Sequence, residues 1–188
     1  MPKPLLIIIS GKPGTGKTTL GKKIAKEFHL PFISKDAIKE SLFDDLGWSD
    51  RAWSRKLGVA TYSLLYYFIE SLLSAGVSFI AESNFKPELA NETFQALKKK
   101  HGFKLLQIMC ETKGEVLFER FKARTESGER HPGHVDHLNL DEFKEMLLKG
   151  GHEPLDIGGQ VYRLDTTDFN SIDYKKLFSA IKSALIRK

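Results

Sequence analysis

The segment GKPGTGKT at residues 11–18 constrains this chain more than any other feature of its sequence. It follows the aliphatic run LLIIIS at residues 5–10 and precedes a stretch in which Leu20, Ile24 and Phe28 recur at helical spacing. A strand, a turn with the pattern G-x-x-x-x-G-K-[ST] and an amphipathic helix form the context in which this pattern cradles phosphates. The matching context disfavours the alternative of an ordinary glycine-rich turn.

Each residue type in this segment has a physical reason. The glycines remove side chains so that backbone N–H groups can surround a di- or triphosphate, and the following helix adds the positive end of its dipole. Lys17 can place an ammonium between the β- and γ-phosphates, and Thr18 can offer a hydroxyl oxygen to Mg²⁺. The predicted nucleotide-binding residues in this segment are Gly11, Lys12, Pro13, Gly14, Thr15, Gly16, Lys17, Thr18 and Thr19.

Length and composition limit the other possibilities. A chain of 188 residues suffices for one domain with a core and is short for two. The single cysteine, Cys110, excludes an internal disulfide framework, and the aliphatic run at residues 5–9 is too short to span a membrane. We therefore expect a cytoplasmic protein with no membrane partner and no obligate protein partner. The net charge of +5 says little about nucleic acid, because lysine clusters such as residues 98–100 are typical of solvated helix ends.

Strand-like and helix-like segments alternate along the whole chain. The expected strands are residues 5–10, 31–36, 77–83, 103–111 and 160–167, and the segments between them carry helical periodicity. This alternation predicts one α/β domain over residues 1–188, with a three-layer doubly wound fold and a five-stranded, mainly parallel sheet. A polar segment at about residues 125–139 is expected to form a small lid. In such sheets, ligands bind beyond the carboxyl ends of the strands.

Acidic residues follow the second and third expected strands. Asp36 can accept a proton from an attacking hydroxyl, and Lys39, one helical turn later, can bind an acidic acceptor group. The alternative for Asp36 is a helix N-cap. Glu82 occupies the position of an acid that orders Mg²⁺, and Asn84 can bind the acceptor. The reverse assignment, with Glu82 as the base and Asp36 binding substrate, stays open at this point.

Three arginines lead into the expected lid. Arg120 and Arg124 share a helix face at i, i+4 spacing, and Arg130 follows in the polar segment. Guanidinium groups on a mobile segment can neutralise charge during phosphoryl transfer and help exclude water. The alternative is a solvated helix face whose arginines pair with neighbouring glutamates.

The lid also contains a histidine cluster, His131, His134 and His137. A zinc site is disfavoured, because the spacing matches no closed structural site and no cysteine is near. We expect His131 and His134 to cap or hinge the lid around the Pro132-Gly133 pair.

Taken together, the segments GKPGTGKTTL, ISKDAIKESL, FIAESNF, RFKARTESGERHPGH and YRLDTTD resemble the adenylate-kinase-like P-loop kinases. The resemblance is to the branch with polynucleotide 5′-hydroxyl kinase, chloramphenicol phosphotransferase and zeta-toxin-like kinases. It implies ATP and Mg²⁺ as cofactors, Asp36 as catalytic base, Arg120 against the adenine and Arg124 at the phosphates. It also implies that Thr166 and Thr167 border the base. Lys39 departs from the arginine that polynucleotide kinases carry there.

These observations predict an ATP- and Mg²⁺-dependent kinase that phosphorylates a hydroxyl of a small molecule or of a nucleoside or polynucleotide 5′ end. Lys17, Asp36, Arg124 and Arg130 are the expected catalytic residues, with Thr18 and Glu82 at the metal. A nucleoside-monophosphate kinase is disfavoured, since residues 31–100 contain only Arg51 and Arg55 to hold an acceptor phosphate. The alternative is an ATPase switch without a small-molecule acceptor.

Overall fold

The computed structural model of the chain describes residues 3–135, 140–149 and 151–186. Its strands lie close to the segments expected from the hydrophobic pattern. They are β1 (Leu5–Ser10), β2 (Phe32–Ser34), β3 (Phe79–Glu82), β4 (Lys104–Glu111) and β5 (Gln160–Asp165). Over the described ranges they form one five-stranded sheet in the order β2-β3-β1-β4-β5, and every neighbouring pair is parallel. The expected sheet is confirmed.

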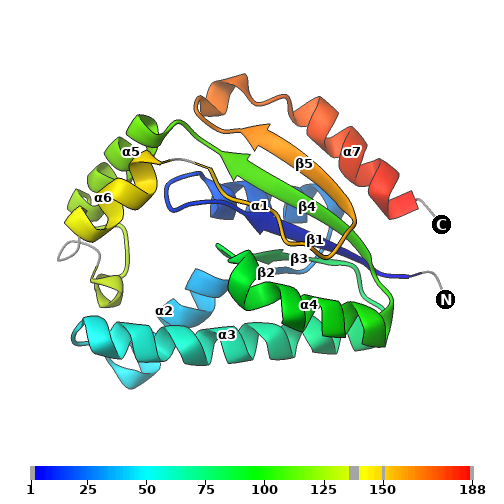
Figure 1. Cartoon of the computed structure of the whole chain (residues 1–188), viewed down its shortest axis with the longest axis horizontal. Coiled ribbons are helices and arrows are strands. Elements are labelled where there is room, and N and C mark those ends of the chain that lie inside the picture. The colour runs from blue at the N-terminus through cyan, green and yellow to red at the C-terminus, as the bar shows by residue number, and fades with distance from the viewer. Residues whose placement is uncertain (1–2, 136–139, 150, 187–188) are drawn as a thin grey trace.

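Helices cover both faces of this sheet (Figure 1). They are α1 (Lys17–Phe28), α2 (Lys35–Leu46), α3 (Arg51–Ser74), α4 (Pro87–His101), α5 (Gly114–Glu126), α6 (Leu140–Leu148) and α7 (Tyr174–Ile186), with the short 3-10 turns η1 (Pro132–His134) and η3 (Phe169–Ser171). α1 and α7 pack on one face, and α3 and α4 pack on the other. The three layers explain why β1 is buried along its whole length instead of alternating between apolar and polar residues.

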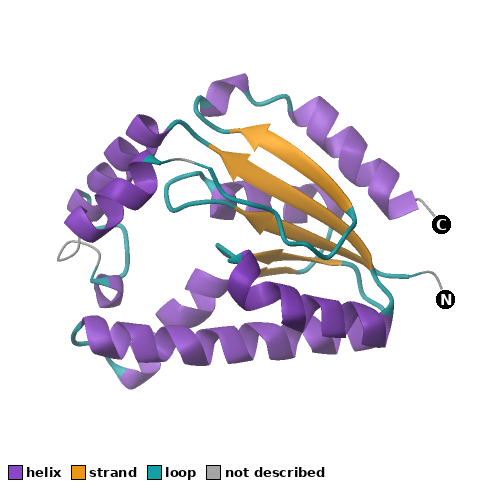
Figure 2. Ribbon diagram, in the orientation of Figure 1, coloured by secondary structure: helices purple, strands orange, loops and turns teal. Residues whose placement is uncertain are grey.

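Figure 2 shows α5 and α6 beyond the carboxyl ends of β1 and β4, at the opposite end of the sheet from the two termini. These two helices share a small apolar core made by Leu117 and Phe121 of α5 and Leu147 of α6. α6 was not among the expected helices, because its apolar pattern spans only nine residues after a polar segment. The helix completes one wall of the region where ligands bind in parallel sheets.

The structure also corrects the expected boundary between β2 and α2. The helix begins at Lys35, and its N-cap residue is Ser34. Asp36 lies inside the first helical turn, so the alternative that Asp36 is the N-cap is wrong. Its carboxylate is therefore available for other contacts, although its charge still complements the helix dipole. Across residues 3–135, 140–149 and 151–186, no helix combines the length and apolar character that a membrane crossing requires.

Candidate active site

A cleft of about 1080 Å³ opens at the carboxyl ends of the strands. Most of the residues expected to bind nucleotide, metal or acceptor line it together. They are Pro13, Gly14, Thr15, Gly16, Lys17, Thr18, Thr19, Asp36, Lys39, Glu82, Asn84, Arg120, Arg124, Arg130 and Thr166. Gly11, Lys12 and Thr167 lie outside this lining. The cleft is thus built from segments that are far apart in the sequence and that the parallel sheet brings to one edge.

The loop at residues 11–16 is held in shape by its own contacts. The Lys17 ammonium donates a hydrogen bond to the Lys12 carbonyl oxygen over 3.0 Å, and the Thr15 hydroxyl donates to the same oxygen over 2.9 Å. Gly16, the N-cap of α1, has a φ of 78°. This left-handed conformation favours glycine, and a Cβ atom on Gly16 would lie 2.7 Å from Phe169 Cε1, so the Phe169 ring would also have to move.

Burial lowers the pKa of Lys17, while the nearby Glu82 and Asp36 carboxylates oppose this shift. A cation in such surroundings is costly to desolvate and gains strongly from a nearby anion. The Lys12 side chain instead donates a hydrogen bond to the Met146 carbonyl of α6. Lys12 therefore connects the loop at residues 11–16, called the phosphate loop below, to α6. The sequence pattern does not predict this contact.

A carboxylate and two hydroxyls meet at the ends of β2 and β3. Glu82 is paired with Ser34 in the parallel register of the two strands, and its carboxylate accepts a 2.6 Å hydrogen bond from the Ser34 hydroxyl. The Thr18 hydroxyl lies 3.2 Å from the same carboxylate oxygen. Glu82 is only 4% exposed. Hydroxyl and carboxylate oxygens suit Mg²⁺, which takes few protein ligands and completes its shell with water and phosphate oxygens. The donor set thus fits Mg²⁺.

The Asp36 carboxylate lies between two cations. Its oxygens are 3.1 Å from Lys35 Nζ and 3.2 Å from an Arg130 guanidinium nitrogen. Burial raises the pKa of Asp36, but Lys35, Arg130 and His134 outweigh it and hold that pKa well below its ordinary range. The side chain keeps 37% of its surface exposed. Asp36 is therefore an ionised carboxylate that a ligand in the cleft can reach.

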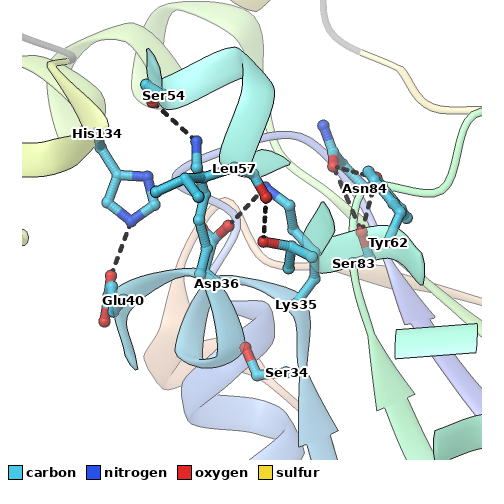
Figure 3. A network of polar contacts seen from close by, with 12 residues as sticks. Ser34, Lys35, Asp36, Glu40, Ser54, Leu57, Tyr62, Ser83, Asn84 and His134 are labelled. Carbon is cyan, nitrogen blue, oxygen red and sulfur yellow. Dashed lines mark hydrogen bonds and ion pairs between the residues drawn. The ribbon is translucent and has the colours of Figure 1, made fainter. Parts of the chain in front are cut away.

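Arg130 and His134 link the lid segment to α2. An Arg130 guanidinium nitrogen lies 3.1 Å from His134 Nδ1, and His134 Nε2 lies 2.9 Å from a Glu40 carboxylate oxygen. Figure 3 shows the His134–Glu40 pair on one side of Asp36 and the Tyr62, Ser83 and Asn84 side chains on the other. The chain from Arg130 to His134 thus borders the expected acceptor site.

The same segment packs around Phe43 of α2. The His131 ring stacks on Phe43 at 5.1 Å between centroids, and the His134 ring meets Phe43 edge-on at 5.4 Å. His131 Nδ1 also accepts a hydrogen bond from the Gly133 amide, so His131 caps η1 as expected. His137 lies outside the described residues. Among those described, no three His, Cys, Asp or Glu side chains are grouped closely enough to hold a metal ion.

Arg120 is fixed at the opposite end of the cleft. Its two terminal nitrogens donate hydrogen bonds of 2.8 and 2.7 Å to the carbonyl oxygens of Thr166 and Thr167. Its guanidinium lies 3.9 Å from the centre of the Phe169 ring. Phe169 was missed by the sequence reasoning, because one aromatic residue in a polar loop has no distinguishing pattern. Arg120, Thr166 and Phe169 thus line one corner of the cleft, where the Arg120 guanidinium is held flat.

Lys39 lines the cleft and is almost fully buried. Its ammonium donates a 2.8 Å hydrogen bond to the Ser54 hydroxyl of α3. Burial, with a further contribution from Lys35, lowers the pKa of Lys39 to about 8. The structure thus places the Lys39 ammonium in the cleft lining, beside Ser54 of α3 and 5.1 Å from the centre of the Phe43 ring of α2.

The environment of Asp36 predicts a pH dependence of stability. Its folded-state pKa lies below that of an unfolded aspartate, so its ionised form stabilises the fold above about pH 4 and this stabilisation is lost as the pH falls. In Asp36→Asn, the free energy of unfolding should therefore fall less steeply between about pH 5 and pH 3 than in the wild type. Urea unfolding followed by circular dichroism measures the two slopes. Parallel slopes would contradict the stabilisation assigned to the ion pairs of Asp36 with Lys35 and Arg130.

Comparison with known proteins gives a match over most of the chain. The model of one family, AAA_33, described as an AAA domain, matches residues 6–148, from β1 to the end of α6. The crystal structure of a protein from Chloroflexus aurantiacus J-10-fl, provisionally described as a kinase, superposes with a TM-score of 0.88. The two sequences are 39% identical, and the match covers 98% of this chain and 100% of that one.

Two curated proteins match over shorter segments. A cytidylate kinase of Ignicoccus hospitalis is 41% identical over 44 residues, which are 23% of this chain and 26% of that protein. A shikimate kinase of Bacteroides fragilis is 51% identical over 37 residues, which are 20% of this chain and 21% of that protein. The matches therefore span about a quarter or less of the length of these curated relatives.

Proposed function

Because this chain belongs to the AAA_33 family of P-loop kinase domains, we propose that it is an ATP- and Mg²⁺-dependent kinase that phosphorylates a hydroxyl group. One observation gives this proposal its main support. The phosphate loop with Lys17, the Thr18–Glu82 pair and the ionised Asp36 all line a single cleft. A phosphate site, a metal site and a reachable carboxylate are the parts that phosphoryl transfer to a hydroxyl requires.

In this proposal, the backbone of the phosphate loop and Lys17 bind the β- and γ-phosphates. Thr18 and Glu82 would hold Mg²⁺, which when bound neutralises charge on the phosphate oxygens. Arg124 and Arg130 line the same cleft and neutralise the charge that spreads over the phosphoryl group during transfer. The lid segment and α6 restrict water, which would otherwise compete with the acceptor.

Asp36 is the proposed base. The acceptor hydroxyl donates a hydrogen bond to the Asp36 carboxylate. A bond forms between the oxygen of the acceptor hydroxyl and the γ-phosphorus, and the bond between the γ-phosphorus and the β-phosphate oxygen breaks, which releases ADP. The hydroxyl proton moves to Asp36. Because the pKa of Asp36 is low, this proton moves late, and the carboxylate mainly orients the hydroxyl in line before transfer. Glu82 suits this role less, since Ser34 and Thr18 already donate to its nearly buried carboxylate.

An acceptor screen tests the proposed activity. Purified protein with ATP and Mg²⁺ is given nucleosides, 5′-hydroxyl oligonucleotides, sugars, and phenicol or aminoglycoside antibiotics. We expect ADP release that depends on one acceptor class, with the phosphorylated product seen by mass spectrometry. ADP release at the same rate with and without every acceptor would instead identify an ATPase switch.

The corner around Arg120 predicts an effect on nucleotide affinity. We propose that the adenine lies against the Arg120 guanidinium, which Phe169 and two carbonyl oxygens hold flat. Arg120→Lys removes the planar surface and one of the two hydrogen bonds, so the KM for ATP should rise about tenfold with a smaller change in kcat. Steady-state kinetics measure both constants. Lys122→Ala, on the exposed side of α5, is the control, and an unchanged KM in Arg120→Lys would contradict the assignment.

A further inference from the structure

A second cavity, of about 460 Å³, lies between α3 and α4 next to the end of β3. We call it the aromatic pocket, because Tyr62, Tyr66 and Phe85 line it, with Val59 and Leu89 also in its wall. Its volume falls in the range of about 300–1,000 Å³ that is usual for small-molecule sites. The phosphoryl-transfer mechanism proposed above uses none of these five side chains.

The aromatic side chains are held in place before any ligand binds. The Tyr62 hydroxyl lies 3.0 Å from the Ser83 hydroxyl and donates a 3.2 Å hydrogen bond to the Asn84 side-chain oxygen. The Tyr62 and Tyr66 rings are 6.1 Å apart between centroids, and each lies about as far from the Phe85 ring. Preorganised rings lose little conformational entropy on binding, which favours ligand affinity.

The aromatic pocket adjoins the proposed acceptor site. Lys35 and Asn84 line both the aromatic pocket and the large cleft. Lys35 Nζ lies 3.1 Å from an Asp36 carboxylate oxygen and 5.8 Å from the centre of the Tyr62 ring. One ammonium group is therefore close to both the proposed base and the ring of Tyr62. Figure 3 shows its contact with Asp36. A single small molecule can contact both the proposed base and this ring.

The lining indicates the chemistry of the ligand. Two large apolar side chains, Leu89 and Val59, are 74% and 71% exposed, which leaves apolar surface open to solvent beside the rings. Among the residues that the structure describes, the charged ones in the lining are Lys35 and Lys86, and none of the lining residues carries a carboxylate. Aromatic and aliphatic walls favour a planar apolar group, and the two lysines disfavour a cationic one.

We propose that the aromatic pocket binds an uncharged or anionic aromatic ring of the acceptor whose hydroxyl lies at Asp36. The acceptor class is then an alcohol that carries such a ring, and the pocket selects it over a ring-free alcohol. The identification of the ring's owner as a phosphoryl acceptor rests on the proposed function. The affinity of the pocket for a ring does not depend on it.

Ring binding can be measured without ATP. Titration of the protein with phenyl β-D-glucoside or 2-phenylethanol should shift the NMR signals of the Tyr62 and Tyr66 rings, and leave Tyr162 on β5 unchanged. Methyl β-D-glucoside and ethanol, which lack the ring, should shift none of the three.

Two variants test which side chains bind the ring. Tyr66→Leu removes one aromatic wall of the pocket, and Leu89→Glu places a charge at its exposed rim, so each should weaken ring binding about fivefold. Ile186→Glu, at a position that is 80% exposed on α7, is the matched control.

The outcomes separate the two proposals. Shifts at Tyr62 and Tyr66 that both variants weaken support the aromatic pocket, even if no alcohol is ever phosphorylated. The aromatic-pocket proposal is overturned if neither ring probe shifts these signals, or if wild type, Tyr66→Leu and Leu89→Glu bind the probes with equal affinity. Either result leaves the proposals of ATP binding and phosphoryl transfer unaffected.

In the acceptor screen, ring-bearing alcohols should give a higher kcat/KM than ring-free alcohols. Leu89→Glu should reduce that preference but not the turnover of ring-free alcohols.

Discussion

Replacing Asp36 by asparagine should reduce phosphoryl transfer about 10²- to 10⁴-fold, the usual contribution of a positioned acid or base. Asparagine keeps the shape of the side chain but cannot accept the hydroxyl proton. Because Asp36 belongs to α2 and not to the phosphate loop, the affinity for ATP should change little. Single-turnover transfer to the acceptor found in the screen measures the rate, and calorimetry with ATP measures the affinity.

Glu82→Gln is the informative companion to Asp36→Asn. If Glu82 serves Mg²⁺, its substitution should raise the Mg²⁺ concentration needed for half-maximal rate, whereas Asp36→Asn should leave that requirement unchanged. Full turnover in Asp36→Asn with the cognate acceptor would show that the base is elsewhere. In that case the reverse assignment, with Glu82 as base, becomes the better account.

Replacing Lys17 by alanine should lower kcat/KM for ATP about 10²- to 10³-fold, as expected when a charge-stabilising donor is removed from a transferred phosphoryl group. Burial already lowers the pKa of Lys17, which shows that the folded protein holds this cation at an electrostatic cost. Its removal relieves that cost and loses the hydrogen bond to the Lys12 carbonyl oxygen, which still accepts one from the Thr15 hydroxyl. The free energy of unfolding should therefore change little. The combination of a large kinetic loss with unchanged stability would distinguish a phosphate ligand from a structural lysine.

Lys26→Ala is the control for Lys17→Ala, because Lys26 lies exposed on the same helix, α1, outside the cleft lining. Steady-state kinetics on both variants, with urea unfolding to check stability, complete the comparison. Equal kinetics in Lys17→Ala and Lys26→Ala would remove the role assigned to the phosphate loop.

The parts of the fold that could be predicted are those with strong local patterns. β1 reads as a continuous aliphatic run because both of its faces are covered, and the glycines and lysine after it have fixed physical roles. The positions of Asp36 and Glu82 followed from the rule that parallel strands end at one edge. The exact start of α2 did not, because the residue at its N-cap position, Ser34, makes no side-chain capping hydrogen bond, and its hydroxyl donates to Glu82 of β3, a strand distant in the sequence.

The rest depended on tertiary contacts that a single sequence does not encode in any regular spacing. The docking of His131 and His134 around Phe43 joins residues about ninety positions apart. The support that Phe169 gives to Arg120 and the aromatic pocket around Tyr62 likewise need the folded sheet to bring distant segments together. In our proposal such contacts set the choice of acceptor, so a single sequence does not name it.

Isothermal titration calorimetry of the wild-type protein with ATP in the presence of Mg²⁺ tests the central claim most directly. The claim is that the loop at residues 11–18 binds the phosphates of a nucleoside triphosphate. We predict saturable heat with one nucleotide per chain, and a much weaker signal for Lys17→Ala. The claim would be contradicted if neither ATP nor GTP gave heat, or if Lys17→Ala bound as tightly as the wild type.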